Sequence, residues 1–419
     1  MRRHKLNWIW IILLGLFVGS CEDYLDRSPD DGLSEDDVYK DYSSLLGFMD
    51  RIFQNGDILI FTHGINSYSN TYVTVGNLSD EYASVRDNDP SKFVNAGNWL
   101  ENASTRFEIG SKSDGANFKS AISRAYTGLR IVNRVISGVD QVKSITDDQR
   151  RKLLGQAHFL RAYFYWMLIR SFGPVPIVPD EGVDYTKEYD DIAYPRNTYD
   201  ECADYIAEEL VKAATMLDDE RDVQNIVRPT RGAALALRSR VLLYAASPLY
   251  NGQAPSEVID ALVDKSGRKL LSDTYDNRKW ARAAAAAKDV MELKRYQLYV
   301  AYKRESDDMA YPTTITPPDD NGTFHSQDWP YGWKNIDPFE SYRSLFDGEV
   351  GAYNNDEIIF TRGVNQGAEN IRVMVIHQLP RSQGGGYNCH GMTQKQCDAY
   401  YMKDGSDCPG MNSMYKGME

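Results

Sequence analysis

The stretch TDDQRRKLLGQAHFLRAYFYWMLIRSFGP, residues 146–174, contains both ends of one long helix and its buried face. TDDQ at 146–149 has the spacing of a capping box, in which two side chains satisfy free backbone amides at a helix start. Gly173-Pro174 ends the pattern, because glycine takes the left-handed turn and proline cannot continue a helix. We therefore predict one amphipathic helix, with the aromatic run FLRAYFYW (159–166) as packing core. Its apolar positions recur at intervals of four and three: Leu153, Ala157, Leu160, Phe164 and Met167.

Similar periodicity flanks this helix on both sides and predicts further helices. A second capping box, TYDE at 198–201, precedes one of them, and TRGAALALRSRVLLYAASPLY (230–250) is its expected partner, ending near Pro248. The expected apolar faces are Phe118, Ile122, Ala125, Leu129, Val132 and Ile136; Ala203, Ile206, Leu210, Ala213 and Leu217; and Trp280, Ala284, Ala287 and Met291.

Alanine-rich helices that come in pairs with short connections are typical of stacked helical hairpins. We therefore predict a mainly α fold with a tetratricopeptide-like helical frame over about 115–295, although no strict 34-residue repeat is visible. Loop-rich regions over about 55–113 and 303–390 flank this frame, and loops of such length inside a domain are usually functional. Within the second region we expect two short strands, DEIIF (356–360) and IRVMVIHQL (371–379).

The N-terminus has the pattern of an export signal. Basic residues within 1–5 precede an apolar run at 8–18, which is too short for a bilayer-spanning helix of roughly twenty residues. Val-Gly-Ser-Cys at 18–21 resembles a bacterial lipobox, in which the cysteine thiol receives diacylglycerol. We predict that residues 1–20 are a signal peptide and that lipidated Cys21 anchors the mature chain to a membrane. The alternative is an ordinary secretion signal with an incidental cysteine.

Charge argues against a nucleic-acid partner. Loss of residues 1–20 removes three of the 47 basic residues and none of the 60 acidic ones, which leaves a formal charge of −16. A chain so acidic offers no basic stripe to follow a phosphate backbone. Acidity at this level serves mainly solubility.

Motifs for catalysis, metal or cofactor binding are not found. The sequence contains no H-E-x-x-H, G-x-S-x-G or G-x-G-x-x-G, and His158 falls inside a helical stripe, where a structural role is expected. Cys202 fits a buried helical position. Cys389, Cys397 and Cys408 are separated by seven and ten intervening residues, a spacing unlike that of zinc ligands. One disulfide among these three is compatible with export, and its pairing stays open.

Two stretches are candidates for ligand binding. HSQDWPYGW (325–333) places Trp329, Tyr331 and Trp333 at alternate positions, so all three rings would point to one side if the backbone were extended. Aromatic rings stack on the apolar faces of sugars, while polar side chains bond the hydroxyl groups. The alternative is that one or two of these rings fill the core beneath the loop.

The second candidate is NLSDEYASVRDND (77–89). Its Asp80, Glu81 and Arg86 are suited to bonding sugar hydroxyls, and Trp99 lies nearby in the sequence. The alternative is that Asp80 and Glu81 form a structural cap.

Five stretches in order resemble hallmarks of the SusD/RagB family of outer-membrane lipoproteins: GQAHFLRAYFYWMLIRSFGPVPIV (155–178), TRGAALALRSRVLLYAASPLYNG (230–252), WARAAAAAKDVMEL (280–293), NNDEIIF (354–360) and TQKQCDAYYMKDG (393–405). The resemblance implies one SusD-like domain over 21–419. It also implies a non-catalytic, cofactor-free protein at the cell surface that captures oligosaccharide for a SusC-like TonB-dependent transporter.

Three other functions stay open beside this one: capture of peptides or glycopeptides, a surface glycoside hydrolase, and a purely structural lid. Family members commonly continue well beyond DAYYMKDG (398–405), whereas this chain ends fourteen residues later. We therefore expect the C-terminal part of the family fold to be missing.

Overall fold

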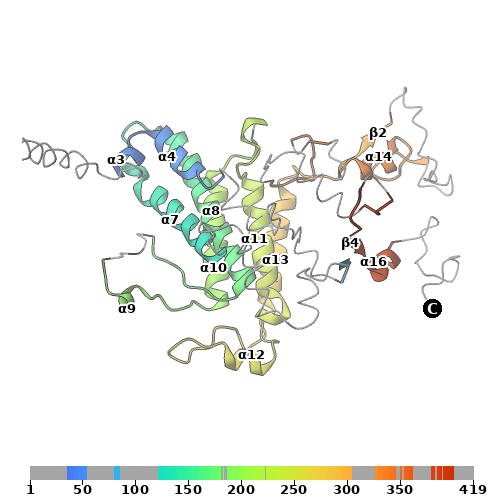
Figure 1. Cartoon of the computed structure of the whole chain (residues 1–419). Helices are drawn as coiled ribbons and strands as arrows, with labels where there is room; N and C mark the ends of the chain where they lie inside the picture. The colour runs from blue at the N-terminus through green and yellow to red at the C-terminus, as the bar shows by residue number, and fades with distance from the viewer. Residues whose placement is uncertain are drawn as a thin grey trace, which may run out of the picture.

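The computed structural model describes residues 35–53, 80–84, 121–180, 183, 186–221, 223–303, 326–345, 350–351, 353–361, 379–382, 385–388 and 390–400. The predicted lipid-attachment residue Cys21 and the candidate ligand residues Arg86 and Trp99 lie outside these ranges. The described part is a row of helices with smaller elements beyond one end of it (Figure 1).

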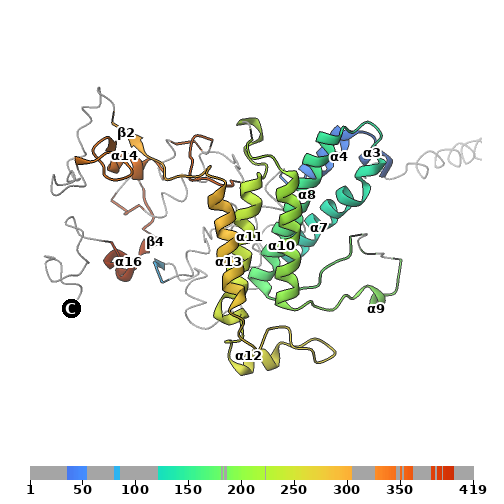
Figure 2. The same ribbon diagram turned by 180° about the vertical axis from the view of Figure 1, so that it is seen from behind.

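The long helices lie side by side in the order in which they occur along the chain, as opposite views show (Figures 1 and 2). They are α7 (Ala121–Gly138), α8 (Asp147–Phe172), α10 (Tyr199–Met216), α11 (Arg231–Ala246) and α13 (Arg278–Glu292). Two shorter helices, α3 (Glu35–Val38) and α4 (Tyr42–Asp50), pack at the α7 end. This confirms the predicted mainly α stack of helical hairpins.

The ends of the helices follow the sequence signals. Thr146 and Gln149 form a complete capping box at the start of α8, as do Thr198 and Glu201 at the start of α10. Gly173 ends α8 with a φ of 69°, a conformation that favours glycine. α11 ends two residues before Pro248, as predicted.

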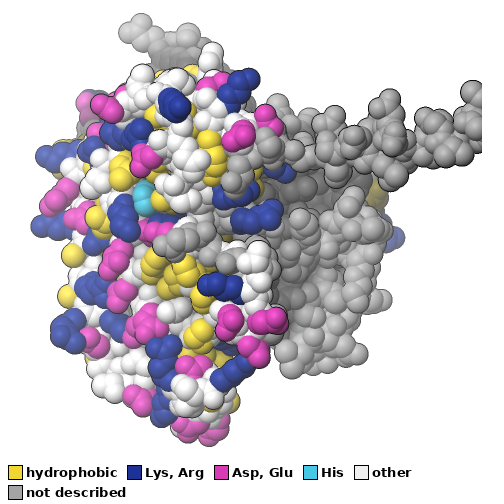
Figure 3. Space-filling view, turned by 90° about the vertical axis from the view of Figure 1, so that its left-hand side faces the viewer, with side chains coloured by type: hydrophobic (Ala, Val, Ile, Leu, Met, Phe, Trp, Pro, Cys, Tyr) yellow, Lys and Arg dark blue, Asp and Glu magenta, His cyan; other side chains and the backbone are white. Residues whose placement is uncertain are grey.

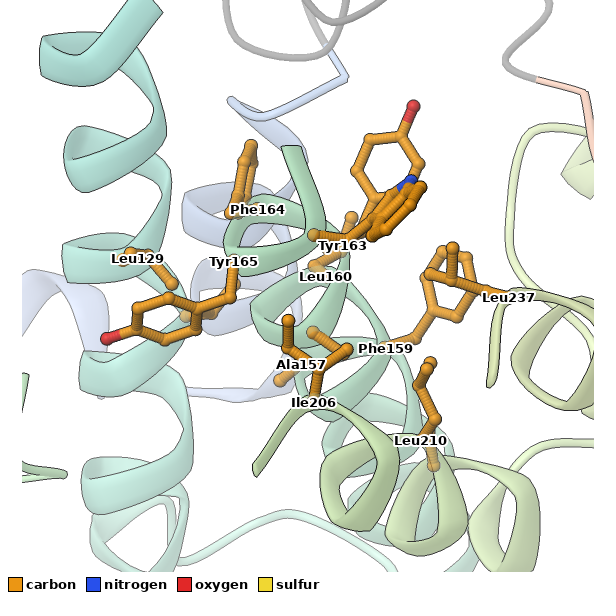
Figure 4. Packing of buried hydrophobic residues seen from close by; sticks show 14 of the residues in the cluster. Leu129, Ala157, Phe159, Leu160, Tyr163, Phe164, Tyr165, Ile206, Leu210 and Leu237 are labelled. Atoms are coloured by element: carbon orange, nitrogen blue, oxygen red, sulfur yellow. The ribbon is translucent and has the colours of Figure 1, made fainter. Parts of the chain in front are cut away.

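Helix α8 lies in the middle of the core. Every residue of 159–166 is buried, which confirms that this aromatic run is packing core. Figure 4 shows Leu129 of α7 on one side of α8 and Leu237 of α11 on the other. α7 approaches closely at Gly128, where an added Cβ would lie 2.4 Å from the ring of Phe164.

The connections between helices are mostly longer than expected. Among the long helices, only α7 and α8 are joined by a short link, which contains η6 (Val139–Gln141). The other connections carry short helices of their own: α9 (Tyr189–Ile192), η7 (Val223–Asn225), η8 (Pro248–Tyr250) and α12 (Ser256–Ala261).

Helix α13 buries a different face from the predicted one. Ala283 and Ala286 are the buried positions, whereas Met291 is 76% exposed and Trp280 is 39% exposed. The five consecutive alanines at 283–287 make several faces of this helix equally apolar. Periodicity therefore could not identify the face that packs on α11.

Two small antiparallel ladders lie beyond the α13 end. β1 (Tyr82–Ser84) pairs with β4 (His390–Met392), and β2 (Ala301–Tyr302) pairs with β3 (Ile336–Asp337). α14 (Pro338–Arg343) follows β3, and α16 (Gln394–Asp398) follows β4. The strand predicted at 356–360 is wrong, because this segment consists of turns and irregular backbone. Most of the other expected strand, 371–378, lies outside the described residues.

Buried charge fixes α8 against α10. The carboxylate of Glu209 has no exposed surface, and its Oε2 lies 2.7 Å from both His158 Nδ1 and Arg161 Nε. Its other oxygen accepts a hydrogen bond from Lys212 Nζ at 2.8 Å. Arg161 also donates to Asp180 at 2.6 Å. His158 thus has the structural setting expected for it.

Burial alone would raise the pKa of Glu209. The hydrogen bonds from His158 and Arg161 outweigh burial and lower the pKa to about 2 from a usual 4.5. A carboxylate with a depressed folded-state pKa stabilises the fold above its unfolded-state pKa. This stabilisation is lost as the pH falls from 4.5 toward 2.

We therefore expect Glu209→Ala to lower the free energy of unfolding by about 3–5 kcal/mol at pH 7, because it leaves the buried Arg161 without one of its two carboxylate partners. Urea denaturation measures this change. The matched control is Glu292→Ala, which removes an exposed partner of Lys288 on α13 and costs less than about 0.5 kcal/mol. The stability difference between the wild type and Glu209→Gln should shrink below pH 4.5. A pH-independent difference would contradict this account.

Candidate functional site

The main candidate site is the tyrosine-rich unit, which we define as residues 299–303 and 326–345. Its ladder is extended by the Lys303 backbone amide, which donates to the Asn335 carbonyl at 3.0 Å. The Ala301 amide donates to Ser341 Oγ at 2.9 Å, and this hydroxyl donates to the Asp337 carbonyl at 2.6 Å. Strand β2, strand β3 and helix α14 are thereby held as one piece.

Within this unit, residues 326–335 form successive turns. The Trp329 amide donates to Asn335 Oδ1 at 2.8 Å, and the amides of Tyr331 and Gly332 donate to the Asp328 carbonyl at 3.0 and 3.1 Å. The peptide bond between Trp329 and Pro330 is cis. The backbone is therefore not extended, and the alternation expected for the three rings of HSQDWPYGW does not apply.

The three predicted rings differ in exposure. Tyr331 is 76% exposed, whereas Trp329 and Trp333 are half-buried. Lys303 Nζ lies 4.9 Å from the centroid of the Trp333 ring, within the range of a cation–π interaction. Tyr331 is thus the ring of this motif most open to a ligand.

Two exposed tyrosines of the same unit were missed in the sequence. Tyr302 in β2 is 58% exposed and Tyr342 in α14 is 60% exposed. Both lie outside the dense aromatic motif. Only the pairing of β2 with β3, and of both with α14, brings them into the unit.

Residues 353–361 connect the tyrosine-rich unit to the helical frame. Asp356 Oδ2 accepts a hydrogen bond from Gln297 Nε2 at 2.8 Å, and Glu357 accepts one from the Tyr299 amide at 2.9 Å. The ring of Phe360 packs edge-on against Phe159 of α8, with 5.2 Å between centroids. The stretch predicted as a strand therefore serves as a tether between the site and the core.

Asp80 lies two residues before β1, which pairs with β4, and among the described residues its hydrogen bonds and ion pair are to Thr393 and Lys395 and not to the candidate rings. Its carboxylate pairs with Lys395, and the hydrogen bond from that lysine lowers the pKa of Asp80. Its carbonyl accepts a hydrogen bond from Thr393 Oγ1 at 2.6 Å, and the Glu81 carbonyl accepts one from the Thr393 amide. These contacts match the structural alternative for Asp80 and Glu81. Asp80 as a ligand residue stays a prediction.

Among the described residues, no three His, Cys, Asp or Glu side chains gather as metal ligands would. Burial raises the pKa of the Cys202 thiol to about 11, and this residue is the buried apolar position that was predicted. Cys397 has a free, exposed thiol. Its two candidate disulfide partners, Cys389 and Cys408, lie outside the described ranges.

The face at the α3–α7 end of the frame carries acidic and basic side chains intermingled with small apolar areas (Figure 3). The described part of this face therefore presents no field of a single sign. None of the described helices combines the length and apolarity needed to cross a bilayer.

Comparison with known families identifies the fold. The profile of a SusD-like family, described as starch-binding associating with outer membrane, matches residues 23–243, which are more than half of the chain. The chain belongs to the SusD-like family. Among curated protein sequences no match is found.

Solved structures of SusD-like proteins share the fold. The protein BT4246 is 21% identical with a TM-score of 0.63, and the match covers 90% of this chain and 59% of that one. A SusD-like protein from Bacteroides fragilis, BF3747, is 21% identical with a TM-score of 0.53, covering 91% and 57%. The chain thus spans less than two thirds of the length of either structure.

The tyrosine-rich unit depends on the N-cap of α14, where Asp337 accepts a hydrogen bond from the Glu340 amide at 2.9 Å. We expect Asp337→Ala to destabilise this unit by about 1 kcal/mol, because it removes the cap. Hydrogen exchange should show faster exchange in β2, β3 and α14, with unchanged protection in α8 and α10. Asp337→Asn, which retains a capping oxygen, is the matched control. Equal exchange in both variants would show that the cap is dispensable.

Proposed function

We propose that this protein is a glycan-binding lipoprotein of the outer membrane, exposed at the cell surface. It captures oligosaccharide and passes it to a SusC-like TonB-dependent transporter. The family's description as starch-binding and associated with the outer membrane supports the glycan and the location. The lipobox pattern at Cys21 supports the anchor.

The observation that carries the proposal is the exposed tyrosine surface on a tethered unit. Tyr302, Tyr331 and Tyr342 each expose more than half of their side-chain surface within a few short elements. Exposed flat rings on hydrogen-bonded elements, here a strand, a turn and a helix, are suited to stacking on pyranose rings. Such a surface loses little conformational entropy when it binds.

A surface glycoside hydrolase is the less favoured function, because hydrolysis requires a pair of available carboxyl groups. The described part of the tyrosine-rich unit has three carboxylates. Asp337 caps α14 and Glu340 pairs with Arg343, which leaves Asp328. Capture of peptides by the same surface is the second alternative, since exposed tyrosines also suit peptide ligands.

The test is affinity electrophoresis of the detergent-solubilised full-length protein in native gels cast with different polysaccharides. We expect retardation by at least one polymer and about tenfold weaker binding by Tyr331→Ala, because a stacked ring is lost. The matched control is Tyr275→Ala, which removes a 48% exposed tyrosine near the start of α13. Folded protein that no polysaccharide retards would instead favour peptide capture or a structural lid.

The lipid anchor has its own test. In cells supplied with radiolabelled palmitate, the wild type should incorporate label, whereas Cys21→Ala should not and should leave the membrane fraction. Cys397→Ala, which removes an exposed thiol elsewhere, is the control and should remain labelled. Membrane retention of unlabelled Cys21→Ala would show that another feature holds the protein there.

A further inference from the structure

The tyrosine-rich unit carries two lysines, Lys303 and Lys334. The ammonium of Lys303 is held over the Trp333 ring, and it donates a hydrogen bond to the Lys334 carbonyl at 3.1 Å. An ammonium has three N–H donors, so this fixed group has donors left for a ligand. Both lysines are exposed.

The acidic groups of the same unit are mostly engaged. Asp337 caps α14, and Glu340 forms a bidentate pair with Arg343 at 2.8 and 3.0 Å. Lys303 and Lys334 are in no ion pair within the described residues. The unit therefore offers two ammonium groups against the one remaining carboxylate of Asp328. The chain as a whole carries a formal charge of −13.

The position of Lys303 also affects how a sugar can bind. Its ammonium covers one face of the Trp333 ring, so the more exposed Tyr331 is the better stacking surface. Lys334 follows Tyr331 by three residues in the same run of turns, and the Lys303 ammonium bonds the Lys334 carbonyl. A carboxylate or sulfate group on the sugar would add the attraction of a full negative charge to the hydrogen bonds that these ammonium groups donate, and N⁺–H···O⁻ bonds of this kind are short and strong.

We propose that the ligand of this unit is an acidic oligosaccharide, whose carboxylate or sulfate groups are bound by Lys303 and Lys334. This inference rests on the proposed glycan-binding function and adds the chemical class of the glycan. The unit would then discriminate between polysaccharides by their charge, while Tyr331 would stack on sugar rings whether or not they are charged.

The experiment compares polygalacturonate and chondroitin sulfate with neutral starch and dextran, by affinity electrophoresis of the solubilised full-length protein. We expect an acidic polymer to retard the protein most. The double variant Lys303→Gln/Lys334→Gln should bind it at least tenfold more weakly, and added salt should weaken wild-type binding. Lys288→Gln is the control, since it removes a 74% exposed lysine of α13. Circular dichroism confirms that each variant is folded.

Three results would overturn the inference while leaving the proposed function intact. One is retardation by a neutral polymer with no preference for acidic ones. Another is equal binding of an acidic polymer by the wild type and the double variant. Competition by inorganic sulfate at the concentration of the sugar's acidic groups would also overturn it, because it would show a simple anion site. Retardation by none of the four polymers would count against the proposed function itself.

Discussion

The carboxylate of Glu209 is the constraint on which the rest of the frame depends. It has no exposed surface, and it faces His158 and Arg161 of the neighbouring helix. Desolvating such a group is costly unless its partners are well placed, so the observed register of α8 against α10 is the one that supplies them. Helix α7 also packs on α8, α11 packs on α10, and the ring of Phe360 in the tether packs edge-on against Phe159 of α8.

The frame and the candidate site are built by different means. The frame is a continuous apolar core. Among the described residues of the tyrosine-rich unit, Ile336 is the one large apolar side chain that is fully buried, and the unit is held by backbone and side-chain hydrogen bonds. Such a unit can leave large rings at its surface, because its stability does not require them inside. The tether at 353–361 gives this small unit a fixed support, which a stacking surface needs if binding is to cost little ordering.

Local signals account for what the sequence predicted well. The capping boxes at Thr146 and Thr198 and the apolar face of α8 that contains Phe164 depend only on residues close in sequence. The structure therefore has them as the sequence predicted. The alanine run of α13 lacks such information, since its alternative faces are equally apolar. Strands of two or three residues have no periodicity to detect, and their partners lie far along the chain. For the candidate site, aromatic density led to the prediction of Trp329, Tyr331 and Trp333, which stays a prediction. Their exposure depends on turns, and Lys303 and Tyr302 join the unit only through strand pairing.

The pairing of β1 with β4 has a consequence for the order of folding. The hydroxyl of Thr393 bonds the carbonyl of Asp80 across 313 positions of sequence, while neighbouring helices of the frame join segments close along the chain. Closing so large a loop before the frame exists costs much chain entropy, and distant contacts form slowly. The chain is synthesised from its N-terminus onward. Strand β1 in segment 80–84 is therefore made long before β4, the strand with which it pairs. A ribosome or export channel that pauses before residue 390 would therefore hold a finished frame with an unclosed strand.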